Sequence, residues 1–320
     1  MLAIVLDHLA RQRNVSLQLF HVHHGLLAQA DGWTKQVGDL AKLLGRPLDI
    51  LRIDIASFEG KGMEAAARDA RYHALAQAAA RQGVNTLWLA HHQDDQAETV
   101  LLRLLRGAGV AGMGAMRSET TRDGVRYLRP WLSVPRSVIL QAMSEFTHAT
   151  GWAPVLDPSN VDPRYTRAAV RTALTPALNA RWPGWQAIVA RHARQADEAA
   201  ALLEEVAAAD LATIRSGPDK SAPALEFDVA FELLGWRALS APRQRNLLRY
   251  WLSLLGARMP SEARLADLQR QLMQLHSLGH DRNMVFDHGT LRIRCVRGQV
   301  RAENRPKKSD LQQEGCKGLE

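Results

Sequence analysis

The sequence predicts an α/β fold, in which a parallel sheet flanked by helices is followed by mainly α-helical domains. Three strand patterns alternate with three long helical patterns in the first 130 residues. The strand patterns lie at 15–22, 48–55 and 86–90, and the helical patterns at 30–44, 63–81 and 93–106. Parallel strands need crossover connections of this length, so the alternation predicts βαβ units and a parallel sheet.

The remaining patterns predict how the chain is divided. A helical pattern at 2–14 opens the sequence without a capping residue before it. After residue 130, further helical patterns occur at 135–150, 164–215, 242–255 and 262–275, followed by a hairpin pattern at 284–296. We therefore expect an α/β domain (1–130), a helical connecting region (131–215), a small middle domain (216–300) and a tail without regular structure (301–320).

The composition narrows the functional classes. The chain has 320 residues, with 41 Lys and Arg against 33 Asp and Glu, and this net charge of +8 favours a polyanionic partner. Two cysteines, Cys295 and Cys316, exclude a disulfide framework and a four-cysteine zinc site, and a reducing, cytoplasmic setting is expected. No apolar run reaches about 18 residues, so we expect no membrane span.

Three carboxylates follow the third strand pattern, at the sheet edge where open parallel sheets bind ligands. Asp94 and Glu98 are four residues apart, and Asp95 and Glu98 are three apart, so a helix brings them onto adjoining faces. Such carboxylates hold Mg²⁺ or a substrate ammonium group, although acids in a first turn also complement the helix dipole. Capping suffices to explain Asp94 and Asp95 alone. Glu98 lies deeper among leucines and needs a partner.

Histidines gather at the same predicted edge. His21, His23 and His24 follow the first strand pattern, and His91 and His92 follow the third. Neighbouring residues on a strand point to opposite faces, and this spacing is unusual for zinc. We therefore expect these side chains to contact a ligand or pack in the core rather than bind a metal.

Arginines supply the positive charge. Arg71 lies on the alanine-rich helical pattern at 63–81, and the residues alone leave open whether it reaches the crevice. The segment 103–171 holds ten arginines and no lysine against five acids. Within it, Arg164, Arg167 and Arg171 are spaced to share one helix stripe, a geometry that suits phosphate contacts or a solvated basic face.

Together these motifs resemble the tRNA(Ile)-lysidine synthetase family, a member of the ATP-pyrophosphatase (PP-loop) group with an adenine-nucleotide α-hydrolase-like fold. The HHxxDDxxET block and the DxSN segment are the most specific features, and the resemblance covers about residues 1–297. The matching segments occur in the family's order: HVHHGL (21–26), GMEAAARDARY (62–72), HHQDDQAETVLLRLLRG (91–107), LRPWL (128–132) and DPSNVDPRYTRAAVR (157–171).

The resemblance implies a reaction and its participants. The family uses ATP to join L-lysine to C2 of the wobble cytidine in the CAU anticodon of tRNA(Ile), through an adenylated cytidine. It implies that Asp94, Asp95, Glu98 and Arg71 are catalytic, that Asp94 and Asp95 bind Mg²⁺, and that the ATP crevice includes His21, His23, His24 and His92. The implied tRNA contacts are Arg103, Arg106, Arg129, Arg164, Arg167 and Arg171. A homodimer is the assembly to test.

The sequence also departs from the family pattern. The ATP-binding loop S-G-G-x-D-S and the central strand before it are absent, and so is the further carboxy-terminal domain of longer members. We therefore expect the printed sequence to be shorter than its family at both ends. Two alternatives follow: a catalytically dead remnant of the ligase, or a related ATP-dependent tRNA-thiolating enzyme. Residues 1–130 contain no cysteine, which argues against sulfur transfer.

Overall fold

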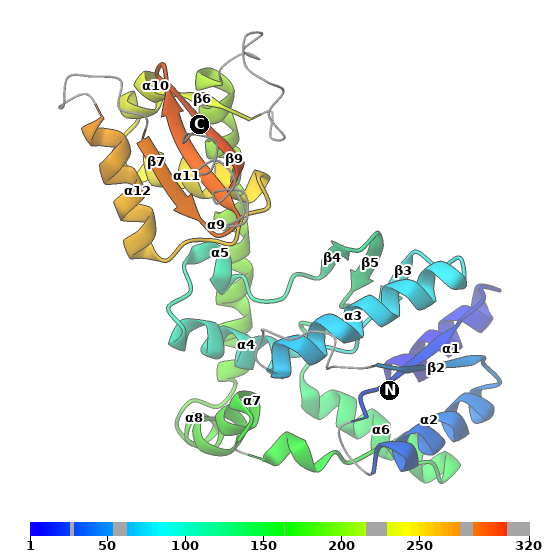
Figure 1. The fold of residues 1–320 in the computed structure, drawn as a ribbon. Coiled ribbons are helices and arrows are strands. Elements are labelled where there is room, and N and C mark those ends of the chain that lie inside the picture. The colour runs from blue at the N-terminus through cyan, green and yellow to red at the C-terminus, as the bar shows by residue number, and fades with distance from the viewer. Residues whose placement is uncertain (26–28, 54–62, 163, 216–228, 276–283, 306–320) are drawn as a thin grey trace, which may run out of the picture. The chain divides into compact units, whose positions relative to one another are not determined.

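The computed structural model describes residues 1–25, 29–53, 63–162, 164–215, 229–275 and 284–305. The chain forms two compact units, Met1–Glu198 and Ala199–Glu320, and the division falls within the long helix α9 (Trp185–Ile214) (Figure 1). No helix of the described residues is long and apolar enough to cross a membrane.

The first unit carries the predicted parallel strands, but in two separate pieces. β1 (Leu19–His23) pairs in parallel with β2 (Leu48–Arg52). β3 (Thr86–Trp88) pairs in parallel with β5 (Val125–Leu128), which pairs antiparallel with β4 (Glu119–Arg122). No ladder joins the two pieces within the described residues.

One helix joins the two pieces through its side chains. α3 (Met63–Arg81) packs Tyr72, Leu75 and Ala79 into a single core that also contains Leu51 of β2 and Tyr127 of β5. Alanines on α3 let it approach both pieces closely, and Figure 1 shows it running alongside them. Side-chain packing therefore holds the two pieces together, as a continuous ladder of hydrogen bonds does in an unbroken sheet.

The other elements of the first unit are helical. They are α1 (Leu2–Gln12), α2 (Ala30–Leu44), α4 (Gln93–Leu105), α5 (Val110–Met113), α6 (Arg136–Thr150), the 3₁₀ turn η2 (Pro158–Val161), α7 (Thr166–Ala169), the π-helix η3 (Val170–Leu174) and α8 (Thr175–Arg181). The expected bounds of α2 and α3 are confirmed. α2 ends because Gly45 adopts a left-handed conformation with φ of 63°. α6 is anchored to α2 by Trp152, whose Nε1–H donates to the Gln36 carbonyl at 2.9 Å.

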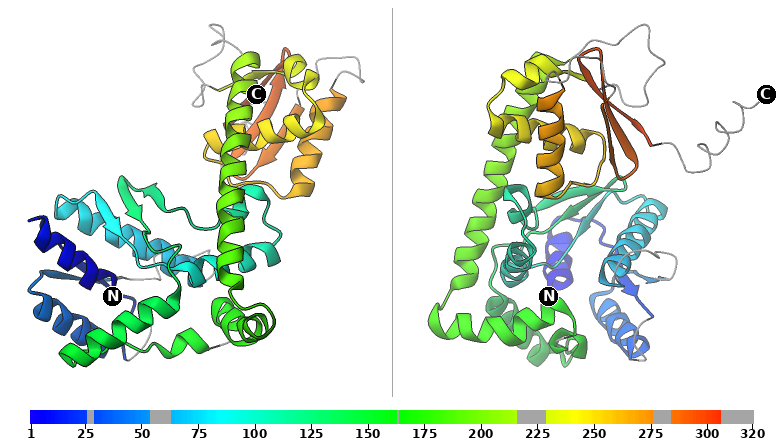
Figure 2. Two further views of the ribbon diagram at one scale, coloured as in Figure 1. Left: turned by 180° about the vertical axis from the view of Figure 1, so that it is seen from behind. Right: turned by 60° about the vertical axis from the view of Figure 1, so that its left-hand side comes forward.

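The second unit is a four-stranded antiparallel sheet with helices packed on one face (Figure 2). Its core contains Trp236, Trp251, Leu268 and Ile293. The elements are β6 (Phe231–Glu232), α10 (Leu233–Ala238), α11 (Ala241–Leu254), α12 (Glu262–Gln274), β7 (Met284–His288), β8 (Leu291–Val296) and β9 (Gln299–Asn304). The predicted hairpin at 284–296 is confirmed as β7 and β8.

Two differences from the sequence analysis have local causes. The hairpin of β4 and β5 was not predicted from the strand patterns. Its turn nevertheless has a sequence signal, because Asp123 and Gly124, with φ of 51° and 76°, form the Asp-Gly turn typical of a tight hairpin. Residues 301–304 belong to β9 rather than to a tail, because they pair with residues 291–294 of β8 and Ala302 is buried in the core of this unit. The rest of the expected tail, 306–320, lies outside the described residues.

Candidate active site and nucleic-acid interface

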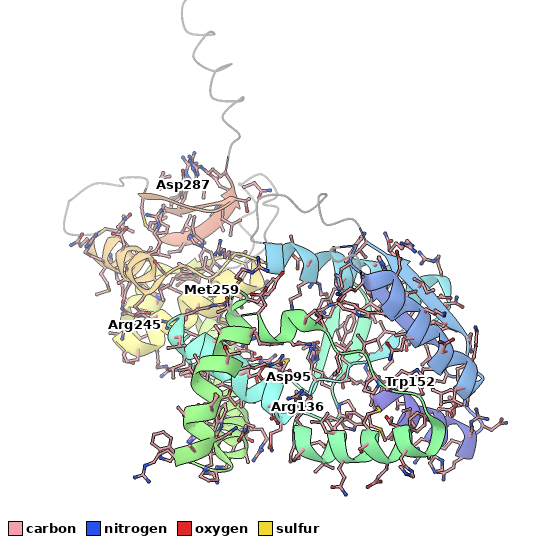
Figure 3. All side chains as sticks on the ribbon, turned by 90° about the horizontal axis from the view of Figure 1, so that it is seen from below. Asp95, Arg136, Trp152, Arg245, Met259 and Asp287 are labelled. Atoms are coloured by element: carbon pink, nitrogen blue, oxygen red, sulfur yellow. The ribbon has the colours of Figure 1, made fainter. Side chains whose placement is uncertain are left out.

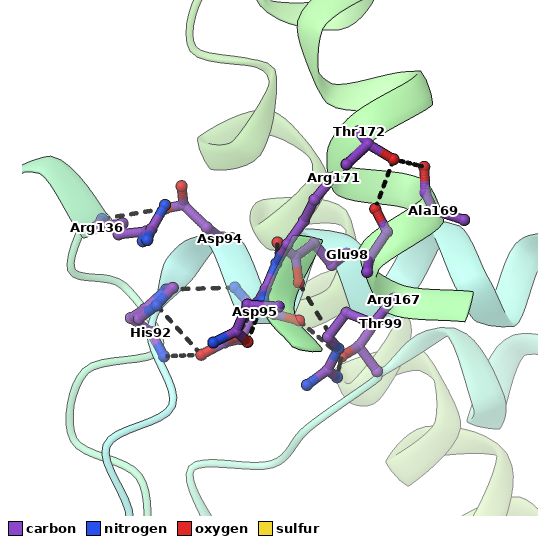
Figure 4. A network of polar contacts seen from close by, with 12 residues as sticks. His92, Asp94, Asp95, Glu98, Thr99, Arg136, Arg167, Ala169, Arg171 and Thr172 are labelled. Atoms are coloured by element: carbon purple, nitrogen blue, oxygen red, sulfur yellow. Dashed lines mark hydrogen bonds and ion pairs between the residues drawn. The ribbon is translucent and has the colours of Figure 1, made fainter. Parts of the chain in front are cut away.

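The acidic cluster lies in the first turns of α4, whose N-terminus has a capping box (Figure 4). His92 Nδ1 accepts a hydrogen bond of 3.4 Å from the Asp95 N–H, and Asp95 Oδ2 accepts one of 3.1 Å from the His92 N–H. Asp94 Oδ2 accepts the Arg136 backbone N–H at 3.1 Å, and Asp95 and Arg136 lie close together in Figure 3. Asp95 therefore caps α4, and Asp94 binds the first N–H of α6.

Glu98 and Asp95 face two arginines from a distant part of the chain. Arg171 Nε donates to Glu98 Oε1 at 2.7 Å, and Arg171 Nη2 donates to Asp95 Oδ1 at 3.2 Å. Arg167 Nε lies 3.7 Å from Glu98 Oε2. The Glu98 side chain is 7% exposed, so the partner that its burial demands is supplied by these guanidinium groups.

The segment that carries these arginines is tied to α4 by further polar contacts. Arg167 Nη2 donates to Thr99 Oγ1 at 3.0 Å, and Thr99 in turn donates to the Asp95 carbonyl at 2.6 Å. Arg171 Nη1 donates to Asn160 Oδ1 at 3.1 Å. The contacts in Figure 4 therefore form one network that docks residues 157–174 on α4.

The expected stripe of three arginines on one helix is wrong for Arg164. α7 begins only at Thr166, so Arg164 precedes it, is 85% exposed and pairs with Asp162 at 2.6 Å. Arg167 and Arg171 do share a face, but that face meets the carboxylates of α4. Spacing alone predicted the shared face and not what would cover it.

A second group of cations surrounds Tyr72, a buried residue of α3. Arg68 and Arg129 donate hydrogen bonds to the Tyr72 hydroxyl at 3.4 and 3.2 Å. The guanidinium carbons of Arg68, Arg71 and Arg122 lie 5.1, 5.8 and 4.9 Å from the ring centroid. Tyr72 therefore holds four guanidinium groups near one another through its oxygen and its π-face. Arg71, left open by the sequence, is part of this group.

The imidazoles beside this group are neutral. Burial lowers the pKa of His91 to about 4 against the pull of Asp95, with Arg129 and Arg68 adding to the shift. Burial also lowers the pKa of His24, and Arg71 lowers it further. Buried Nδ1 atoms of both imidazoles have no hydrogen-bond partner within the described residues. α3 packs against both β1 and β3, because Phe20, Val22 and Leu87 contact the same core as Tyr72. That the ends of these strands line one crevice stays a prediction.

The other predicted histidines take different positions. His21 lies on β1, where burial and His23 lower its pKa. His23 is 7% exposed, and its Nε2 lies 3.2 Å from Asp31 Oδ1. His92 is occupied as the cap of α4. A role for these side chains in binding ATP stays a prediction.

The predicted tRNA contacts differ in accessibility. Arg106 is exposed at the end of α4, whereas Arg103 donates a hydrogen bond to the Gly112 carbonyl and supports α5. Arg129 is 4% exposed and, besides Tyr72, binds the Arg117 carbonyl at 3.0 Å. The geometry of Arg103 and Arg129 favours a structural role, and their tRNA contacts stay predictions.

No group of three or more His, Cys, Asp or Glu side chains is placed to hold a metal ion in the part of the chain that is described. Three further residues make these polar contacts although the sequence patterns did not mark them as site residues: Arg68 at Tyr72, and Thr99 and Asn160 beside Arg167 and Arg171. Thr99 and Asn160 were visible as the last residue of HHxxDDxxET and the Asn of DxSN. Arg68 had only its position one helical turn before Tyr72 as a signal.

The chain is similar in sequence to known proteins over most of its length. Residues 1–178 match a family model described as a PP-loop domain, and residues 231–301 match one described as a TilS substrate binding domain. A tRNA(Ile)-lysidine synthase of Bordetella pertussis is 57% identical over 285 residues, covering 89% of this chain and 86% of the relative. One of Ralstonia nicotianae is 46% identical over 259 residues, covering 81% of this chain and 52% of the relative.

A solved structure shows the same fold. The U34-tRNA thiolase NcsA of Methanococcus maripaludis superposes with a TM-score of 0.50 at 16% sequence identity, covering 62% of this chain and 67% of that one. The fold and the matched domain define a PP-loop protein of the ATP-using class. Within that class, the chain belongs to the tRNA(Ile)-lysidine synthase family.

Proposed function

We propose that this protein is an ATP-dependent carbon–nitrogen ligase that joins the ε-amino group of L-lysine to C2 of the wobble cytidine in the CAU anticodon of tRNA(Ile), forming lysidine. The observation that carries the proposal is the Asp95–Glu98 pair facing arginines, in a chain 57% identical to relatives named tRNA(Ile)-lysidine synthase. The cytidine O2 attacks the α-phosphorus of ATP and pyrophosphate leaves. The lysine ε-nitrogen then attacks C2, loses a proton and displaces AMP, which retains the former O2.

The carboxylates serve the cationic participants. Asp95 and Glu98 bind an ammonium group of lysine, and Asp94 and Asp95 bind Mg²⁺. Mg²⁺ in phosphoryl-transfer sites is held by one or two carboxylates together with substrate phosphates, so a site that ATP completes fits these two residues. Asp94 is only partly buried and binds Arg136 through Oδ2. When bound, Mg²⁺ neutralises negative charge on the phosphates.

The cationic side serves the phosphates. Arg71 is partly buried beside other guanidinium groups and contacts the α-phosphate or the anticodon, where fixed positive charge stabilises the charge that develops during transfer. His24 and His91 are uncharged at neutral pH and accept or donate single hydrogen bonds without adding to the repulsion among the arginines. Arg106 and Arg164 are exposed and contact the tRNA backbone.

Two alternatives are separated by simple observations. A catalytically dead remnant of the ligase is the first alternative, and the transfer test below separates it from the active ligase. A thiolating enzyme is disfavoured because residues 1–130 have no cysteine, and Cys295 is buried in β8 of the other unit.

The test is lysine transfer by the purified chain. Radiolabelled L-lysine, ATP, Mg²⁺ and a tRNA(Ile) transcript with a CAU anticodon are combined, and labelled tRNA and pyrophosphate are measured. A transcript with a UAU anticodon is the control. A second version carries a strand and an S-G-G-x-D-S loop before Met1. Transfer by the chain as printed supports the ligase. Transfer by the extended version alone supports the remnant for the chain as printed, and no transfer by either version contradicts the proposal.

A further inference from the structure

Arg171 occupies a place that is built for a cation. Its guanidinium group lies between two carboxylates, with Nε at 2.7 Å from Glu98 Oε1 and Nη2 at 3.2 Å from Asp95 Oδ1. The carboxylate side chains are 7% and 12% exposed, whereas the Arg171 side chain is 28% exposed (Figure 4). The acids are therefore fixed in the protein, and the cation is the more accessible partner.

The charges of this cluster already balance. Asp95 and Glu98 contribute two negative charges, and Arg171 and Arg167 contribute two positive ones. An ammonium group that approached the same carboxylates would meet a neutral cluster and two guanidinium groups that repel it. Removing a charge from a buried pair is costly when nothing replaces it, so an incoming cation binds well only if Arg171 leaves.

The backbone around Arg171 differs from the rest of the helical segment. Val170–Leu174 is a π-helix, between the α-helical turns of α7 and α8. π-helical turns are wider and less favourable than α-helical ones, so such segments are rare. Those that do occur are frequently found at functional sites. Arg171 thus lies on this π-helical turn, and its Nη1 also donates to Asn160 Oδ1 at 3.1 Å.

We propose that Arg171 is a positioning residue that exchanges between the Asp95–Glu98 pair and an RNA phosphate. In the free protein its guanidinium group fills the cation place. When tRNA binds, one of its backbone phosphates accepts two hydrogen bonds from this guanidinium group. The position between the two carboxylates is then open to an ammonium group of lysine. The inference rests on the proposed function, and it adds an order: tRNA binds first and strengthens lysine binding. Reciprocity requires lysine to strengthen tRNA binding by the same factor.

The exchange is tested by binding of L-lysine alone, measured by calorimetry without ATP. The wild-type protein, Arg171→Ala and Arg181→Ala are compared with and without the CAU transcript. Arg181 is the matched control because it is an exposed arginine at the end of α8. We expect the transcript to tighten lysine binding by wild type and Arg181→Ala about tenfold. Arg171→Ala binds tightly without the transcript and gains nothing from it.

A merely structural Arg171 gives the opposite pattern, in which Arg171→Ala binds lysine no better than wild type without tRNA. That result overturns the exchange. A second measurement follows the ¹⁵Nε–H signal of Arg171 in the wild-type protein, assigned by its loss in Arg171→Lys, and also covers the case in which Arg171→Ala fails to fold. The signal moves on adding the transcript if Arg171 leaves Glu98, and an unmoved signal at saturation refutes the exchange. If no protein binds lysine, the proposed function fails, and this signal still decides the exchange.

Discussion

Glu98→Ala is the substitution whose cost the geometry defines best. It removes the carboxylate that accepts Arg171 Nε at 2.7 Å and lies 3.7 Å from Arg167 Nε. Both guanidinium groups then remain beside a buried void with one fewer negative charge. The substitution therefore tests whether the ion cluster holds residues 157–174 on α4.

The expected cost follows from burial. Removing one partner of a fully buried ion pair costs about 3–5 kcal/mol. The Arg171 and Arg167 side chains are 28% and 33% exposed, so water recovers part of their solvation and we expect about 2–3 kcal/mol. For a unit of this size, that loss lowers the melting temperature by roughly 5–10 °C.

The assay is urea and thermal unfolding of wild type, Glu98→Ala and Glu145→Ala. Glu145 is an exposed carboxylate of α6, and its removal should change stability by less than about 0.5 kcal/mol. A double-mutant cycle with Arg171→Ala should give a coupling energy of about 1–3 kcal/mol. Two results would refute the role of Glu98 in the ion cluster with Arg167 and Arg171: an equal loss of unfolding free energy for the two glutamate variants, or strictly additive effects in the cycle.

Three further predictions concern other parts of the chain. The pKa of His91 is about 4 in the folded state and about 6.5 when unfolded, so its stabilising contribution is complete above pH 6.5 and is lost as pH falls to 4. His91→Asn should therefore reduce the change of the denaturation midpoint with pH over that window, whereas His8→Asn, at an exposed histidine, should not. Tyr72→Phe removes the acceptor of two guanidinium donors and should cost about 1–3 kcal/mol in urea unfolding, with an unchanged midpoint as the contrary result. Arg243→Met leaves the Asp210 carboxylate, 2% exposed, without the Nε–H donor at 3.0 Å and should lower the urea midpoint of unfolding; a midpoint equal to that of wild type would show that water replaces the arginine.

Local signals made the helices of the first unit predictable. α2 and α3 begin and end where the sequence indicated, because apolar period, a left-handed Gly45 and alanine content act within a few residues. The hairpin of β4 and β5 was missed even though its Asp123-Gly124 turn was in the sequence, because its strands alternate polar and apolar residues only briefly. The strand bounds were less accurate than the helix bounds, since pairing partners decide where a strand ends.

The sequence by itself determined which chemical groups are available: carboxylates after the third strand pattern, neutralisable histidines beside them and an arginine-rich segment, in an order that marks the family. Only the tertiary structure decided which of these charged groups form ion pairs with one another. Arg171 and Glu98 are separated by 73 positions, and their pairing depends on how a π-helical turn docks on α4. Electrostatic energy falls with distance in space and is blind to distance along the chain, so no periodicity or spacing in the sequence contains it.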